Sequence, residues 1–169
     1  MQIIRRLFLA QGILLAAVFA LPSFAADKPA GKPVLTLSGK ISQRNDGDRF
    51  IFDMDMLEKL PQHSFTTKTP WFPQPRKFTG PLLRDVLAAA GASGEALLAF
   101  SLNDYKTSIP AQDAAKFDAI VARLIDDKTM SVREKGPLFI IYPFDDKSEL
   151  QSQRYYTRSA WQLKAINIQ

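Results

Sequence analysis

The chain has 169 residues, 46% of them hydrophobic, with a formal net charge of +5, no cysteine and a single histidine, His63. Without a thiol the chain cannot supply a thiolate nucleophile, a haem-attachment motif, an iron–sulfur site or a zinc–thiolate site. A single histidine is too few for a histidine metal cluster and leaves one candidate for the base of a catalytic triad. We therefore expect no catalytic residue. The small positive charge forms no basic stripe, which argues against nucleic-acid binding.

The first 25 residues have the three parts of a secretory signal peptide. Arg5 and Arg6 form a positive start, residues 7–21 are almost wholly apolar, and Ser23 and Ala25 place small side chains at a cleavage site. The apolar stretch is shorter than the ~20 residues that a spanning helix needs. We therefore expect cleavage after Ala25, a periplasmic mature protein and no membrane span once the signal peptide is removed.

The mature part, residues 26–169, is long enough to bury the core of one domain. Alternating apolar residues predict a strand at 34–41, and a second strand at 49–52 follows a turn. A short helix is predicted next, with Asp55 and Glu58 forming a capping box and Pro61 ending it.

The middle of the chain holds a strand at 64–69 and the clearest helix, at 81–90. Gly91 follows this helix where a left-handed residue is needed. Between the two, residues 72–76 are expected to lack regular structure, because Pro73 and Pro75 each remove a backbone donor.

The second half of the mature part is predicted to form mostly short strands. Strands are predicted at 97–102, 107–109, 119–124, 138–142 and 161–168, with a helical turn at 111–117. Many short strands with a few short helices indicate an α+β fold, arranged as a mixed β-sheet or a small barrel. There is no internal repeat and no sign of a second domain.

The order of several motifs from about Thr66 to Ile168 is similar to that of the pterin-cofactor domain of the sulfite oxidase family. The matching segments are Trp71, Phe78 to Leu83, Asp85 to Leu87, Ala90-Gly91, Asn103 to Tyr105, Ile109-Pro110, Ala119 to Ala122, Asp126-Asp127, Gly136 to Leu138, Tyr142-Pro143 and Trp161 to Ile166. The resemblance implies a sulfite oxidase-like fold with a pocket for a pterin.

One departure from that family concerns its metal. Its catalytic members hold molybdenum through a cysteine thiolate shortly before the residue equivalent to Trp71, and here Thr67 falls near that position. A threonine hydroxyl stays protonated near pH 7 and does not replace a soft thiolate. The chain is also about half as long as those enzymes and lacks their cluster of basic, phosphate-binding residues. We therefore expect a molybdenum-free pterin and no metal.

The chain more closely resembles a smaller, metal-free branch of the family, made up of periplasmic pterin-binding proteins. Some members of that branch report pterins to a membrane-bound partner, such as a cyclic-nucleotide cyclase/phosphodiesterase or a sensor kinase. The resemblance, together with the chemistry of a flat heterocycle with a donor–acceptor edge, assigns three roles. The ring would stack on Trp71 and Tyr105, its edge would meet Thr67, Thr69, Asn103 and Asp104, and its substituent would meet Arg76 and Arg154.

Each assignment has a structural alternative. Trp71 can instead fill the core, Tyr105 can be a cross-strand partner, and Asp104 can stabilise its own turn. Arg154 can be an ordinary surface residue. Trp161, in the last predicted strand, is expected in the core and away from the pocket.

Three functions follow from these alternatives. The first is a non-catalytic periplasmic pterin-binding protein that signals to a membrane-bound partner. The second is a molybdopterin-dependent oxidoreductase-like enzyme, or a subunit of one, and the third is an interaction domain without a pocket. The missing cysteine counts against the second, and the clustered aromatic and polar residues count against the third.

Overall fold

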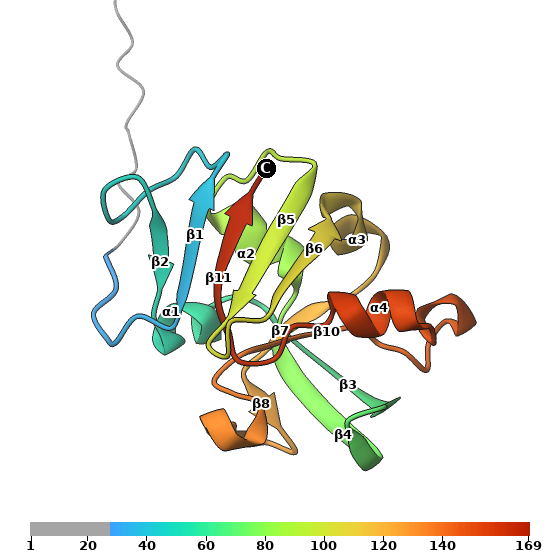
Figure 1. The fold of residues 1–169 in the computed structure, drawn as a ribbon. Helices are drawn as coiled ribbons and strands as arrows, with labels where there is room; N and C mark the ends of the chain where they lie inside the picture. Colours follow the sequence, from blue (N-terminus) through green and yellow to red (C-terminus); the bar gives the residue numbers. More distant parts are fainter. Residues whose placement is uncertain (1–27) are drawn as a thin grey trace, which may run out of the picture.

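A computed structural model describes residues 28–169 (Figure 1). The signal peptide predicted at residues 1–25 lies outside the described residues. The strands are β1 (Leu35–Gly39), β2 (Phe50–Phe52), β3 (Gln62–Thr69), β4 (Phe72–Pro81), β5 (Ala96–Ser101), β6 (Lys106–Pro110), β7 (Ile120–Ala122), β8 (Leu124–Ile125), β9 (Lys128–Thr129), β10 (Phe139–Ile141) and β11 (Leu163–Ile168). The α-helices are α1 (Met54–Lys59), α2 (Leu83–Ala89), α3 (Ala111–Lys116) and α4 (Gln153–Arg158), and two short 3-10 turns span Val132–Glu134 and Ser148–Leu150.

The largest sheet has five strands in the order β2-β1-β11-β5-β6. β1 and β11 run parallel, with Thr36 opposite Ala165, whereas the other neighbours are antiparallel. Helix α2 lies behind this sheet in Figure 1 and buries Leu83 and Val86 completely. Gly91, with a φ of 59°, follows α2 and confirms the predicted helix end.

The remaining strands form two smaller sheets. β3 and β4 make a long hairpin that extends away from the five-stranded sheet, as Figure 1 shows, and β8 and β9 continue it in the order β3-β4-β8-β9. β7 and β10 form a separate buried pair. The α+β class is confirmed, but the barrel alternative is wrong. The largest sheet does not close, because β2 and β6 stand at its two ends and pair with one neighbour each within residues 28–169.

Residues 72–76 correct the prediction of an irregular segment, because they begin strand β4. Phe72 pairs with Thr69 and Arg76 pairs with Thr67, and the register shifts between these two pairs. Pro73 and Pro75 fall within the shifted part, where their missing N–H groups interrupt no cross-strand pair. Proline is therefore compatible with this end of the hairpin.

The N-cap of helix α1 is Asp53, two residues earlier than the predicted Asp55. The carboxylate of Asp53, not that of Asp55, accepts a hydrogen bond from the backbone N–H of Met56 at 2.8 Å. A second hydrogen bond, from the N–H of Gly31 at 2.7 Å, holds the lead-in segment against α1. These bonds lower the pKa of Asp53. Within residues 28–169, no helix is both long and apolar enough to cross a membrane.

Candidate functional site

A tight turn between β3 and β4 positions Trp71. The hydroxyl oxygen of Thr69 accepts hydrogen bonds from the backbone N–H groups of Trp71, at 3.3 Å, and Phe72, at 3.2 Å. Such a side chain to backbone bond replaces the bonds that a turn leaves unmade. Thr69 therefore has a local structural role, and it fixes where the indole of Trp71 leaves the chain.

The ring of Trp71 lies within a group of aromatic side chains. Its centroid is 5.5 Å from that of buried Phe139 and 6.2 Å from that of buried Phe144. It meets Tyr156 at 6.1 Å and Trp161 at 5.4 Å, both edge to face. Trp71 is half-buried, so one part of the ring packs on the core and another part stays open. The pocket and core interpretations of this residue are thus compatible.

The open side of these rings forms a hollow of about 270 Å³, which we call the aromatic cleft. Its lining comes from three segments that are distant in sequence: the β3–β4 turn, the residue after the β5–β6 turn, and helix α4 with the residues that follow it. The lining residues are Pro70, Trp71, Tyr105, Gln153, Tyr156, Thr157, Ser159 and Trp161. Four of the eight are aromatic, and three others carry a hydroxyl or an amide.

Tyr105 joins the β5–β6 turn to the end of α4. Its hydroxyl donates a hydrogen bond of 2.6 Å to the backbone carbonyl of Thr157. Its ring is nearly parallel to that of Trp161, at an interplanar angle of 9° and a centroid distance of 6.3 Å. Because the hydroxyl is held, the ring has a fixed orientation beside the cleft. The structure therefore brings two predicted stacking residues, Trp71 and Tyr105, to one hollow.

A second hollow of about 290 Å³ adjoins the cleft and shares Pro70 and Tyr156 with it. Thr69 and Asp145 line this second hollow. Thr67 lines neither: its side chain is 1% exposed, and its hydroxyl oxygen accepts a hydrogen bond of 3.1 Å from the N–H of Asp145. The carboxylate of Asp145 in turn accepts a bond of 2.9 Å from the N–H of Lys68. Thr67 and Asp145 thus tie β3 to the loop after β10.

A buried polar cluster supports α4 behind the cleft. The carboxylate of Asp113 on α3 accepts hydrogen bonds from the Tyr142 hydroxyl at 2.9 Å and from Arg158 of α4 at 2.8 Å. Asp113 is 3% exposed, and its charge is balanced by the guanidinium. Burial raises the pKa of the Tyr142 hydroxyl well above its usual range, and the neighbouring carboxylate adds to the effect. Tyr142 therefore remains a hydrogen-bond donor at neutral pH.

The other predicted site residues lie outside the cleft. The Asn103 side chain accepts a bond from the N–H of Tyr105 at 3.3 Å, and the Asp104 side chain is 94% exposed, with an ion pair of 3.7 Å to Lys164. Asp104 has a φ of 64°, so it has a turn role. Arg154 is exposed on α4 and lines neither the aromatic cleft nor the hollow that adjoins it.

Arg76 belongs to a different hollow of about 420 Å³, which we call the basic cavity. Four cationic side chains line it: Arg76, Lys128, Arg133 and Lys135. Arg76 forms an ion pair of 2.7 Å with Asp126 there. The two arginines expected to meet a pterin substituent therefore do not share the cleft with Trp71 and Tyr105.

The structure corrects the prediction that Trp161 lies in the core and away from the pocket. β11 begins at Leu163, and Gln162 between them has a φ of 53°, so the alternation of the strand does not extend back to Trp161. Its half-buried ring lines the cleft instead. The α4 residues Gln153, Tyr156 and Thr157 were also missed, because this six-residue helix buries only Tyr155 and has no apolar repeat.

Among residues 28–169, no three His, Cys, Asp or Glu side chains group closely enough to hold a metal ion. The residues that line the cleft offer ring faces and neutral polar groups, which suit an uncharged flat ligand. Neither a protein-family model nor a curated protein matches this chain.

Proposed function

We propose that this chain is a non-catalytic periplasmic receptor for a molybdenum-free pterin. The observation that carries the proposal is the aromatic cleft, in which Trp71, Tyr105 and Trp161 border one hollow. Flat heterocycles bind where aromatic faces provide stacking and a few polar groups fix orientation. A hollow of about 270 Å³ suits a ligand no larger than a single bicyclic ring.

Polar groups at the rim are suited to the edge of a pterin. The Gln153 side chain offers both a carbonyl acceptor and amide donors, and its one hydrogen bond among the described residues is a long one of 3.3 Å to Thr157. The Thr157 hydroxyl donates a hydrogen bond of 2.8 Å to the backbone carbonyl of Gln153 and retains acceptor capacity. An amide matched to a donor–acceptor edge orients the ring without adding charge.

A receptor that catalyses no reaction acts through the protein that recognises its ligand-bound form. Thr67, near the position where the resembling enzymes have their metal ligand, offers a neutral hydroxyl that is already bonded to the N–H of Asp145. Hard neutral oxygen does not replace a soft thiolate for molybdenum. We propose that the pterin-bound protein is read by the periplasmic domain of a membrane-bound signalling protein, and that purified protein holds no stoichiometric molybdenum.

Titration with 6-hydroxymethylpterin, in oxidised and tetrahydro forms, tests the proposal by calorimetry. At least one form should bind one-to-one, and Tyr105→Ala should weaken binding by ~1–3 kcal/mol, the range for stacking on aromatic side chains. Tyr105→Phe is the matched control, because it keeps the ring and removes only the bond to Thr157. If neither form binds the wild type, or if Tyr105→Ala binds unchanged, the proposal fails.

A further inference from the structure

The basic cavity holds more positive than negative charge. Arg76, Lys128, Arg133 and Lys135 line it together with two carboxylates, Asp126 and Glu134. Both carboxylates already have partners: Asp126 lies against Arg76, and Glu134 accepts hydrogen bonds from the hydroxyl and the N–H of Ser131. Four cations against two carboxylates leave an excess of two positive charges facing one hollow.

The cationic groups have unused hydrogen-bond donors. Within residues 28–169, the side chains of Lys128 and Arg133 form neither a hydrogen bond nor an ion pair, and the Nε of Arg76 is buried beside Asp126 without hydrogen-bond geometry. The Lys135 ammonium forms no hydrogen bond or ion pair among the described residues; it lies 5.9 Å from the ring centroid of Phe72 and 4.4 Å from that of Trp161. The Arg76 guanidinium lies 5.5 Å from the same Phe72 ring. Two cations are thus held near one ring, an arrangement that an added anion stabilises.

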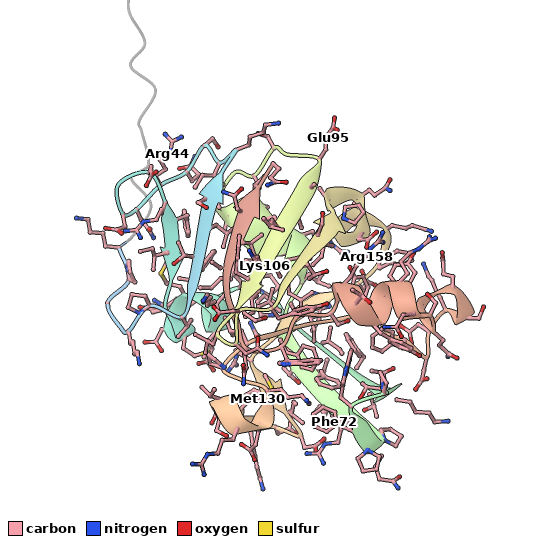
Figure 2. All side chains as sticks on the ribbon, in the orientation of Figure 1. Arg44, Phe72, Glu95, Lys106, Met130 and Arg158 are labelled. Carbon is pink, nitrogen blue, oxygen red and sulfur yellow. The ribbon has the colours of Figure 1, made fainter. Side chains whose placement is uncertain are left out.

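The floor of the cavity is apolar. Phe72 on β4 and Met130 beyond β9, both labelled in Figure 2, contribute to it together with buried Ile125. A ligand with only a charged group would leave this floor exposed to water. A ligand that also carries an apolar body would cover it.

The loop between β9 and Gly136 carries four of the lining residues, Met130, Arg133, Glu134 and Lys135, and contacts along its backbone hold it in place. Gly136 follows this loop, and a Cβ there would meet the carbonyl oxygen of Met130. The carbonyl of Lys135 accepts a bond of 2.8 Å from the N–H of Gln162, whose side chain donates to the carbonyl of Val132, also at 2.8 Å. The backbone that presents Arg133 and Lys135 is therefore pre-arranged, which lowers the entropic cost of binding.

We propose that the basic cavity binds a small organic anion, a carboxylate or a phosphate monoester attached to a ring-sized apolar body. Arg76, Arg133 and Lys128 would meet the anion, and the body would lie on Phe72 and Met130. A hollow of about 420 Å³ suits a ligand of this size. The site is separate from the aromatic cleft and does not depend on pterin binding.

Calorimetry with four probes tests this proposal: phenyl phosphate, benzoate, phenol and inorganic phosphate. Phenyl phosphate or benzoate should bind at least about tenfold more tightly than phenol and inorganic phosphate, because each of the latter offers half of the required chemistry. Comparing the first two distinguishes a phosphate from a carboxylate site. Binding should also weaken as salt is raised.

Substitutions locate the site. The double variant Lys128→Gln, Arg133→Gln should weaken binding of the better anion by about tenfold or more, since both side chains are exposed and make no bond that folding requires. Lys40→Gln removes an equally exposed cation elsewhere and should change nothing. Tyr105→Ala should leave anion binding intact, which separates this proposal from that of the cleft. Failure of every probe to bind, or equal binding by the double variant, overturns the proposal.

Discussion

The aromatic cleft and the basic cavity adjoin each other, and Lys135 of the cavity lies over the ring of Trp161 of the cleft, 4.4 Å from its centroid. They are nevertheless built differently. The cleft rests on buried rings and on the polar cluster of Asp113, so its shape is part of the core. The cavity is bordered on one side by the start of β4, and its other side is formed by two-residue strands and a 3-10 turn whose residues are not buried. We therefore expect the cleft to respond to changes in stability, and the cavity to salt and local backbone changes.

The largest expected effect is that of Asp113→Ala, which removes the common partner of Tyr142 and Arg158. Breaking a buried charge pair leaves its partners unsatisfied, and we expect the free energy of unfolding to fall by about 3 kcal/mol. Urea denaturation with an unchanged slope measures this fall. Pterin affinity should drop as α4 shifts, while anion affinity per folded molecule should not.

Asp118→Ala is the matched control, because the Arg84–Asp118 ion pair is exposed. Exposed pairs contribute under ~1 kcal/mol. Equal losses for Asp113→Ala and Asp118→Ala would mean that the buried cluster does not support the cleft.

Gly136→Ala is expected to affect the basic cavity and spare the aromatic cleft, which is the opposite of Asp113→Ala. The added Cβ would press on the carbonyl oxygen of Met130, so the loop must move at a cost of ~1–3 kcal/mol. Anion binding should weaken, and pterin binding should remain. Gly47→Ala is the control, because at a φ of 61° the added Cβ also strains the backbone, but Gly47 does not line the cavity. Unchanged anion affinity in Gly136→Ala would show that the cavity does not need this loop geometry.

Asp53→Ala should be milder and should spare both hollows. It removes the cap of α1 and the bond to Gly31, and such caps contribute ~1 kcal/mol. Because the pKa of Asp53 is lowered in the folded protein, this contribution is present above the ordinary value of 3.8 and is lost as pH falls through the lowered pKa. Thermal melts of both proteins should differ at pH 7 and converge in acid. A constant difference across pH would contradict the charged cap.

Asp104→Asn is expected to change least. Asn also tolerates the left-handed conformation, and the lost ion pair to Lys164 is exposed at 3.7 Å, so stability should change by under ~0.5 kcal/mol. Pterin affinity should be unchanged, because Asp104 lies outside the cleft lining. A tenfold loss of pterin affinity without a loss of stability would mean that Asp104 does contribute to pterin binding.

The elements that sequence reasoning predicted well are those with their own local signal. The strand at β1 alternates buried and half-buried residues, and α2 has apolar residues on one side and Gly91 after its end. β4 depends on pairing with β3, which tolerates Pro73 and Pro75 only because of a shift in register. No local pattern contains that information.

The residues of the site divide in the same way, into those with a signal in the sequence and those without one. Motif order pointed to Trp71 and Tyr105, which line one cleft. Trp161 was misplaced because the backbone at Gln162 interrupts the strand before it, and Tyr156 lies on a helix too short to show a repeat. Asn103 and Asp104 adjoin Tyr105 in sequence, yet their side chains serve the turn. The motif therefore identified the right segment of the chain, but it did not show which of its side chains line the cleft.

The parallel pairing of β1 with β11 bears on how the protein reaches its native state. β11 stands between β1 and β5 in the five-stranded sheet, so these two strands have no direct pairing with each other. A ribosome must therefore release almost all of the described chain before the sheet can assemble. Contacts between such distant parts of a chain make folding slow. Until β11 is in place, β1 with β2 and β5 with β6 can form only two separate antiparallel pairs, and the five-stranded sheet stays incomplete.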